Sequence, residues 1–144
     1  MRHEVTLPID APAELVWQTM STVEKWPEWT PTMTEIRRLD DGELRVGSTA
    51  EVRQPKQPPR TWTVTELTPG KSFTWVSSGT GLQLAADHVI TTDGDGTVGA
   101  LLTFTVRGVL APVAGLLAGG AMRRAVDTEA ESLKKWCESH RADG

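Results

Sequence analysis

One histidine occupies an otherwise apolar face of a predicted strand, and it is the residue of this chain best suited to chemistry. In the segment 82–91 every second residue from Leu82 is apolar except His88. A neutral imidazole beside a bound carbonyl compound can take up or donate a proton near neutral pH. Such a reaction needs a partner carboxylate or hydroxyl, for which Glu66, Ser77 and Glu129 are the candidates if the fold brings one of them close. The alternative is a structural histidine, hydrogen-bonded to the backbone or to a helix.

The aromatic composition is the second chemical feature, because six tryptophans occur with two phenylalanines and no tyrosine. Indole rings build either a packed core or the wall of a ligand cavity. Trp62 and Trp75 take inward positions on predicted strands, where they either stack on a planar ligand or pack in the core. Trp26 and Trp29 lie in a segment with two prolines and form either a lid over a cavity mouth or a plug. The lack of tyrosine excludes any mechanism that uses a phenol.

Composition and spacing argue against several classes of function. The 144 residues carry a net charge of -4 and no basic cluster, which disfavours a nucleic-acid partner. The three histidines are scattered and Cys137 is the only cysteine, so we expect no metal site and no cofactor. Residues 1–4 have no apolar leader, and the longest charge-free stretch, 108–122, is too short to cross a bilayer. We therefore expect a cytoplasmic protein without stable membrane insertion.

Hydrophobic periodicity predicts the elements that position these residues. Alternation over 2–9 predicts a half-buried strand, and Asp10 as cap with Pro12 in the first turn predicts a helix to about residue 20. The segment 21–24 has the spacing of a capping box, which predicts a second short helix. Alternating segments joined by turn residues then predict six antiparallel strands, at about 33–39, 46–53, 60–68, 71–78, 82–91 and 97–107.

The last segment, 110–140, predicts a long helix. Its apolar residues fall mostly at steps of three, four and seven, and Pro112 suits a first turn. About thirty residues give a rod of about 45 Å with one apolar stripe. Burying this stripe together with the strand faces predicts an α+β fold, in which a curved seven-stranded antiparallel sheet grips the C-terminal helix and two short helices follow the first strand. No linker or repeat interrupts the chain, so we expect a single domain over 1–144.

Several motifs in this order carry a resemblance to a known family. They are Ala-Pro-Ala-Glu-Leu-Val-Trp at 11–17, Trp-Pro-Glu-Trp-Thr-Pro at 26–31, Trp-x-Val-x-Glu-Leu-x-Pro-Gly at 62–70 and Phe-x-Trp at 73–75. With the His88 strand and the glycine-containing approach to the last helix, the chain resembles the SRPBCC (START-like, helix-grip) superfamily, and within it the polyketide cyclase/dehydrase-like group. The resemblance implies a cavity for an apolar or aromatic small molecule between the sheet and the long helix. Some members are aromatase/cyclases and others lipid or quinone carriers, so the resemblance implies a cavity rather than a reaction.

These observations give three functional hypotheses. The first is a protein, monomeric or homodimeric, that binds a small aromatic, polyketide-like or lipid-like molecule in a cavity. The second is a cyclase or dehydratase in which His88 polarises or deprotonates a bound carbonyl compound. The third is a module that binds a partner or membrane lipid through exposed apolar residues around 110–117. In the first two cases we expect Trp29 near the cavity mouth and the lining to include Trp62, Trp75, His88, Phe104, Leu117 and Met122.

Overall fold

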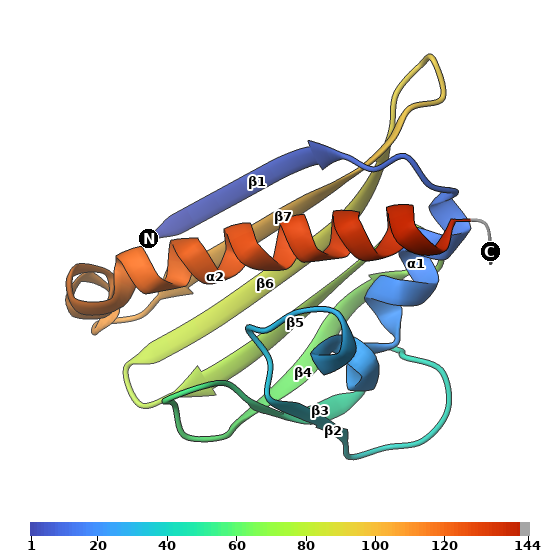
Figure 1. The fold of residues 1–144 in the computed structure, drawn as a ribbon. Coiled ribbons are helices and arrows are strands. Elements are labelled where there is room, and N and C mark those ends of the chain that lie inside the picture. The colour runs from blue at the N-terminus through green and yellow to red at the C-terminus, as the bar shows by residue number, and fades with distance from the viewer. Residues whose placement is uncertain (142–144) are drawn as a thin grey trace.

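A computed structural model describes residues 1–141 of the chain. It contains seven strands, two α-helices and one 3-10 helix, η1 (Figure 1). In chain order they are β1 (Arg2–Pro8), α1 (Ala13–Ser21), η1 (Val23–Glu28), β2 (Glu35–Arg38), β3 (Thr49–Arg53), β4 (Arg60–Thr68), β5 (Ser72–Gly79), β6 (Leu82–Thr92), β7 (Val98–Arg107) and α2 (Ala111–His140). The predicted helix-grip fold is confirmed.

The strands form one antiparallel sheet in the order β1-β7-β6-β5-β4-β3-β2. Consecutive strands from β2 to β7 are neighbours, as short turns between them require. β1 adds to the free edge of β7, with His3 opposite Phe104. The sheet curves around α2, which packs against β1 and β7, while α1 packs against the C-terminal half of α2 (Figure 1). This arrangement puts one face of the central strands opposite the long helix.

The two halves of α2 differ in burial. Ala130, Leu133 and Cys137 in the C-terminal half are fully buried against the sheet and α1. Leu116 and Leu117 in the N-terminal half are 86% and 80% exposed. The apolar stripe predicted along the whole helix is therefore buried over only part of its length. In Figure 1 the start of α2 extends past the strand ends, since a helix of 30 residues spans about 45 Å.

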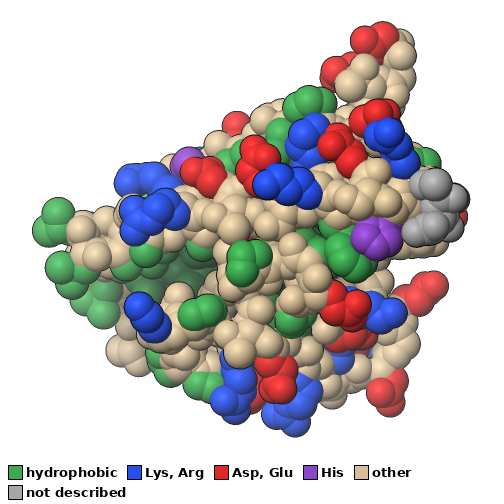
Figure 2. Space-filling model, in the orientation of Figure 1, with side chains coloured by type: hydrophobic (Ala, Val, Ile, Leu, Met, Phe, Trp, Pro, Cys, Tyr) green, Lys and Arg blue, Asp and Glu red, His purple; other side chains and the backbone are tan. Residues whose placement is uncertain are grey.

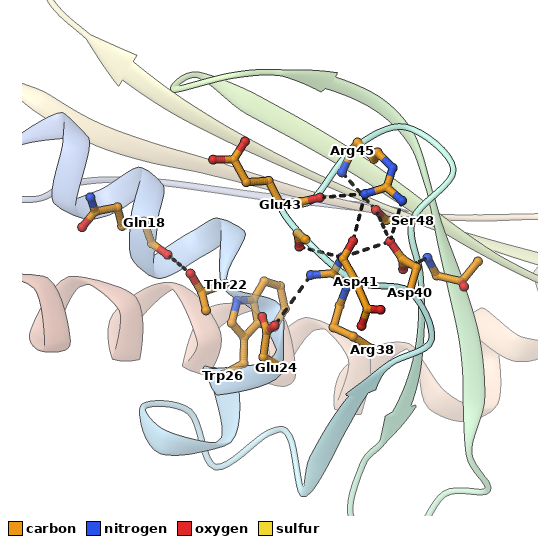
Figure 3. Close-up of polar contacts among 12 residues, drawn as sticks. Gln18, Thr22, Glu24, Trp26, Arg38, Asp40, Asp41, Glu43, Arg45 and Ser48 are labelled. Atoms are coloured by element: carbon orange, nitrogen blue, oxygen red, sulfur yellow. Dashed lines mark hydrogen bonds and ion pairs between the residues drawn. The ribbon is translucent and has the colours of Figure 1, made fainter.

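The connection from β2 to β3 is longer than the sequence predicted, because Asp40 organises the chain there (Figure 3). Its carboxylate accepts hydrogen bonds from the Arg38 guanidinium at 3.0 Å, the Ser48 hydroxyl at 2.9 Å and the Thr49 backbone N–H at 3.0 Å. Partial burial raises the pKa of Asp40, but these hydrogen bonds outweigh it and lower the pKa to about 2. Arg38 also reaches Glu24 of η1 at 3.6 Å, which ties η1 to the sheet.

Both predicted helix caps are wrong. α1 starts at Ala13 and its N-cap is Pro12, so Asp10 lies too far upstream to reach the first free N–H groups. Asp10 instead pairs with Arg141 at 2.9 Å, and its backbone N–H donates to Glu138. Ser21 is the last residue of α1, and the N-cap of η1, Thr22, makes no side-chain cap hydrogen bond. The predicted capping box is therefore not formed.

A glycine pair joins the β5–β6 turn to the start of α2. Gly108 has a φ of 111°, and a Cβ at this position would lie 2.5 Å from the carbonyl oxygen of Gly81. The backbone N–H of Leu110 donates to the same oxygen at 2.8 Å. Only glycine fits this close approach, so Gly108 fixes where the chain turns from β7 into α2.

Candidate functional site

A cavity of about 510 Å³ lies between the sheet and the middle of α2. Strands β3 to β7 supply its floor, residues 54–57 form part of its rim, and α2 supplies its roof from Ala118 to Glu129. Figure 2 shows a hollow with apolar walls on the face of the molecule where α2 crosses the sheet. The cavity is of the size that binds small molecules in other proteins.

Five of the six residues predicted to line the cavity do so: Trp62, Trp75, His88, Phe104 and Met122. The four strand residues share one face because side chains alternate along a strand, and the register places Ala86 opposite Phe104 and His88 opposite Leu102. Met122 belongs to a stripe on α2 that includes Val126 and Glu129 at steps of four and three. Their predicted contact with a ligand stays a prediction.

Leu117, the sixth predicted lining residue, and Trp29, predicted near the cavity mouth, are not among the residues that line the cavity. Leu117 lies on the outer face of α2, where its side chain is exposed. Trp29 packs on Trp26 with ring centroids 5.6 Å apart. Its indole Nε1 is buried and has no hydrogen-bond partner among residues 1–141. For both residues the sequence shows an apolar side chain, but the surface that this side chain contacts depends on the fold.

Trp26 lines the cavity. The sequence is compatible with two roles for it, a lid over the cavity mouth or a plug. Its side chain is 1% exposed, and its Nε1 donates to the Met20 carbonyl at 3.0 Å. The ring lies 5.3 Å from Trp75 and 5.3 Å from His88. Trp26 is therefore a plug that closes one end of the cavity and holds η1 on the sheet.

His88 is buried, and one of its ring nitrogens has a fixed partner. Nδ1 lies 3.3 Å from the carbonyl oxygen of Phe73, which can only accept, so we assign the proton to Nδ1. The ring stacks on Phe73 at 4.3 Å with an interplanar angle of 15°. Burial lowers the pKa of His88 to about 4, although the Phe73 carbonyl and the Asp87 charge act in the opposite direction. At neutral pH the imidazole is uncharged and its Nε2 presents a lone pair.

Of the three candidate partners, only Glu129 lies beside His88. Its Oε2 is 3.7 Å from Nε2 of His88 across the space between α2 and β6. Burial raises the pKa of Glu129 to about 8, so the carboxyl is protonated at neutral pH. Glu66 is exposed, and Ser77 is hydrogen-bonded to Arg60 on a strand position opposite Leu84.

The pair is a neutral acid and a neutral base in an apolar cavity. The carboxyl of Glu129 can donate a proton, and Nε2 of His88 can accept one, either between themselves or through a molecule bound next to them. Burial keeps both side chains uncharged when no ligand is bound. A polar atom of a bound ligand would then compete with each side chain for a hydrogen bond to the other. We refer to His88 and Glu129 as the acid–base pair.

Among residues 1–141 no group of three or more His, Cys, Asp or Glu side chains is placed to hold a metal ion. Across the same residues, no helix is long and apolar enough to cross a membrane. The cavity walls are mainly apolar and aromatic, and their polar groups are the acid–base pair, Asp87 and Thr103, with Gln54, Lys56 and Gln57 at the rim.

Comparison with known proteins supports the fold and gives the family. The sequence matches the family described as "Polyketide cyclase / dehydrase and lipid transport" over residues 2–138. The chain therefore belongs to this family. No curated protein matches the sequence.

Solved structures of similar fold come from several bacteria. A hypothetical protein from Helicobacter pylori is 14% identical with a TM-score of 0.78, covering 94% of this chain and 86% of its own. A protein from Thermus thermophilus is 14% identical with a TM-score of 0.74, covering 96% of this chain and 98% of its own. The Zhui aromatase/cyclase from a Streptomyces species is 20% identical with a TM-score of 0.71, covering 100% of this chain and 98% of its own. At these identities the likeness shows the fold alone.

Proposed function

We propose that the protein binds a small hydrophobic molecule, aromatic, polyketide-like or lipid-like, in the cavity under α2. The cavity of about 510 Å³ with its aromatic walls is the observation that carries this proposal. Trp62 and Trp75 lie 5.6 Å apart with an interplanar angle of 37°, and both face the space that a ligand would fill. Burying a flat apolar molecule against such rings is favourable because it removes apolar surface of both partners from water.

Native mass spectrometry of freshly purified protein, followed by organic extraction, tests this proposal. The expected result is a stoichiometric apolar adduct, or stoichiometric uptake when the unliganded protein is offered aromatic ketones and fatty acids. Substituting Ala125→Trp, at a half-buried position on the roof of the cavity, should abolish the adduct because a large side chain there occupies the space. An adduct that persists in this variant would place the ligand elsewhere and contradict the proposal.

The acid–base pair favours a second candidate, a catalyst acting on a bound carbonyl compound. In this reaction Nε2 of His88 removes a proton from the carbon next to the carbonyl, and the Glu129 carboxyl donates its proton to the carbonyl oxygen. The product is the enol, with His88 protonated and Glu129 ionised, and both groups return to their starting state when the protons are exchanged with water. Enol formation is the first step of carbon–carbon bond formation or dehydration in a poly-carbonyl chain. The aromatase/cyclase of similar fold makes this class of substrate worth testing.

Deuterium exchange separates the binding protein from the catalyst without knowledge of the natural substrate. An aryl methyl ketone is incubated with the protein in heavy water, and incorporation at the methyl carbon is followed by NMR. A catalyst should accelerate exchange, and His88→Asn should abolish the acceleration while the ketone still binds. Glu129→Gln, which removes the proton donor, should also lower the acceleration. Glu131 is an exposed carboxyl two residues away, so Glu131→Gln is the matched control and should leave the exchange rate unchanged. Binding without accelerated exchange would assign the cavity to a carrier.

A further inference from the structure

An exposed apolar surface lies at the start of α2, beside the cavity. We call it the apolar tip, and it consists of Val109, Leu110, Val113, Leu116 and Leu117. Among residues 1–141 these make up five of the seven exposed large hydrophobic side chains, and Val109 and Leu116 are each 86% exposed. Isolated apolar side chains on a surface are common, but a contiguous group marks an interaction site.

The local fold holds this tip away from the core. Val113, Leu116 and Leu117 stand at steps of three and four, so they share one face of α2. The Leu110 backbone N–H is hydrogen-bonded to Gly81 of the β5–β6 turn, and that turn leaves no room for a side chain on Gly108. The start of α2 is thereby anchored in a position where its apolar face meets solvent. Figure 2 shows the hydrophobic side chains projecting at the left end of the molecule, next to the hollow.

The charges around the tip have one sign, although the whole chain carries -4. The segment from Thr97 to Val126 contains no Asp or Glu. It does contain three exposed arginines, Arg107, Arg123 and Arg124. Lys56, on the rim segment across the cavity, adds a fourth exposed cation. None of the four makes an ion pair within residues 1–141. Figure 2 shows Lys and Arg side chains on both sides of the hollow.

In the part of the chain that the structure describes, the acidic groups of the cavity wall and of α2 form no ion pair with these cations, and Asp87 of the wall accepts a hydrogen bond from Thr74. Asp127 is 2.8 Å from Nε2 of His3, so it already has a partner. Glu129 faces into the cavity beside His88. The β5–β6 turn and the segment 54–59 contain no Asp or Glu. The tip is therefore an apolar face with an unopposed basic rim.

We propose that the apolar tip docks the protein reversibly on an anionic phospholipid bilayer. The end of a helix with exposed apolar residues and flanking arginines fits the membrane interface, where the apolar side chains enter the acyl boundary and the cations meet lipid phosphates. A second copy of this chain fits less well, because pairing two tips would bring their arginines together. The surface argument is independent of the function proposed above. If that function also holds, docking places Ala118 and Met122 of the cavity roof next to the bilayer, so an apolar ligand could pass between lipid and cavity with little exposure to water.

Vesicle flotation with two matched pairs of variants tests the proposal. Wild-type protein should float with phosphatidylcholine vesicles that contain phosphatidylglycerol, less with phosphatidylcholine alone, and less at high salt. Val109→Ser with Leu116→Ser should weaken binding by about ten-fold or more, while Leu39→Ser with Val46→Ser, the exposed pair in the β2–β3 connection, should not change it. Arg123→Ala with Arg124→Ala should weaken binding by roughly five-fold per charge. Lys25→Ala with Lys135→Ala, which removes two exposed lysines elsewhere, should not.

Three results would overturn the proposal. They are no flotation of the wild type, equal loss in the variants and their controls, or a dimer in solution that Val109→Ser with Leu116→Ser dissociates while vesicles are not bound. Native mass spectrometry of the same variants without vesicles reports on the cavity. Retained ligand uptake with lost flotation supports docking through the tip. Retained flotation with no ligand uptake by any variant would contradict the proposed function but leave the docking surface in place.

Discussion

Replacing Glu129 by glutamine should change how the stability of the protein depends on pH. In the unfolded chain this carboxyl ionises near its ordinary pKa of 4.5, whereas in the folded protein burial raises the pKa to about 8. Between these values unfolding releases a proton, so the free energy of unfolding falls as the pH rises. The contribution of Glu129 to the free energy of unfolding is fully present below pH 4.5 and is lost by about pH 8. Glutamine resembles the protonated acid and cannot ionise.

The size of the effect follows from the same pKa. Holding the pKa at about 8 instead of 4.5 corresponds to at most roughly 4–5 kcal/mol. Water that enters the cavity stabilises the ionised form, so we expect about 2–4 kcal/mol. Glu129→Gln should therefore match the wild type at about pH 4–5 and exceed its stability by this amount at about pH 8. His88 affects the stability of both proteins at acid pH. Its pKa is about 4 in the folded protein against 6.5 in the unfolded chain, so its contribution to stability is present above pH 6.5 and is lost as the pH falls toward 4.

Urea unfolding followed by tryptophan fluorescence, repeated across this pH range, measures the effect. Glu131→Gln is the control, because Glu131 is exposed on α2 and makes no ion pair within residues 1–141. It should follow the wild-type profile at every pH. If Glu129→Gln also runs parallel to the wild type, Glu129 is ionised in the folded protein at neutral pH. The acid–base pair as described would then be refuted.

Three further substitutions test the structure around the site. Asp40→Asn removes the charge that Arg38 faces and should lower the free energy of unfolding by about 1–3 kcal/mol at neutral pH. This difference should shrink as the pH falls through about 2, where the wild-type carboxylate is protonated; a difference independent of pH would contradict the role given to Asp40. Trp26→Phe leaves the Met20 carbonyl without its donor and should cost about 1–2 kcal/mol in chemical denaturation, whereas an unchanged midpoint would mean that the indole is not a fixed plug. Gly108→Ala should cost more than about 2 kcal/mol, because its Cβ would meet the Gly81 carbonyl. Gly94→Ala, with open space around it, should change stability by less than about 0.5 kcal/mol, and equal effects would refute the close approach.

Much of the fold could be predicted because each strand repeats with period two and is bounded by turn residues. The pairing of β1 with β7 is different, since nothing local in 2–8 specifies a partner about a hundred residues away. The loop between β2 and β3 was also predicted too short. Its length is fixed by hydrogen bonds to Asp40 from Arg38, Ser48 and Thr49, which a hydrophobic pattern does not report.

The strand side of the site was easier to predict than the helix side. Alternation was enough to put Trp62, Trp75, His88 and Phe104 on one face, because every second side chain of a strand points to the same side of the sheet. On α2 the pattern gave a stripe but not which of its residues meet solvent, so Leu117 was predicted in the lining although it is exposed. Glu129 was one candidate among three, and its position between Val126 and Leu133 on the buried stripe was the signal that could have selected it. The pKa values of the pair depend on burial and could be obtained only from the structure.

Fluorescence titration with an uncharged aromatic probe, N-phenyl-naphthylamine, tests the ligand cavity most directly. The wild type should show one saturable site with quenching of its tryptophans, because Trp26, Trp62 and Trp75 face the cavity. Met122→Trp, which fills the roof, should weaken binding by about ten-fold or more. Leu116→Trp adds the same ring to the exposed start of α2 and should leave the affinity unchanged. Equal affinity in the wild type and in Met122→Trp would contradict a ligand site between the sheet and α2.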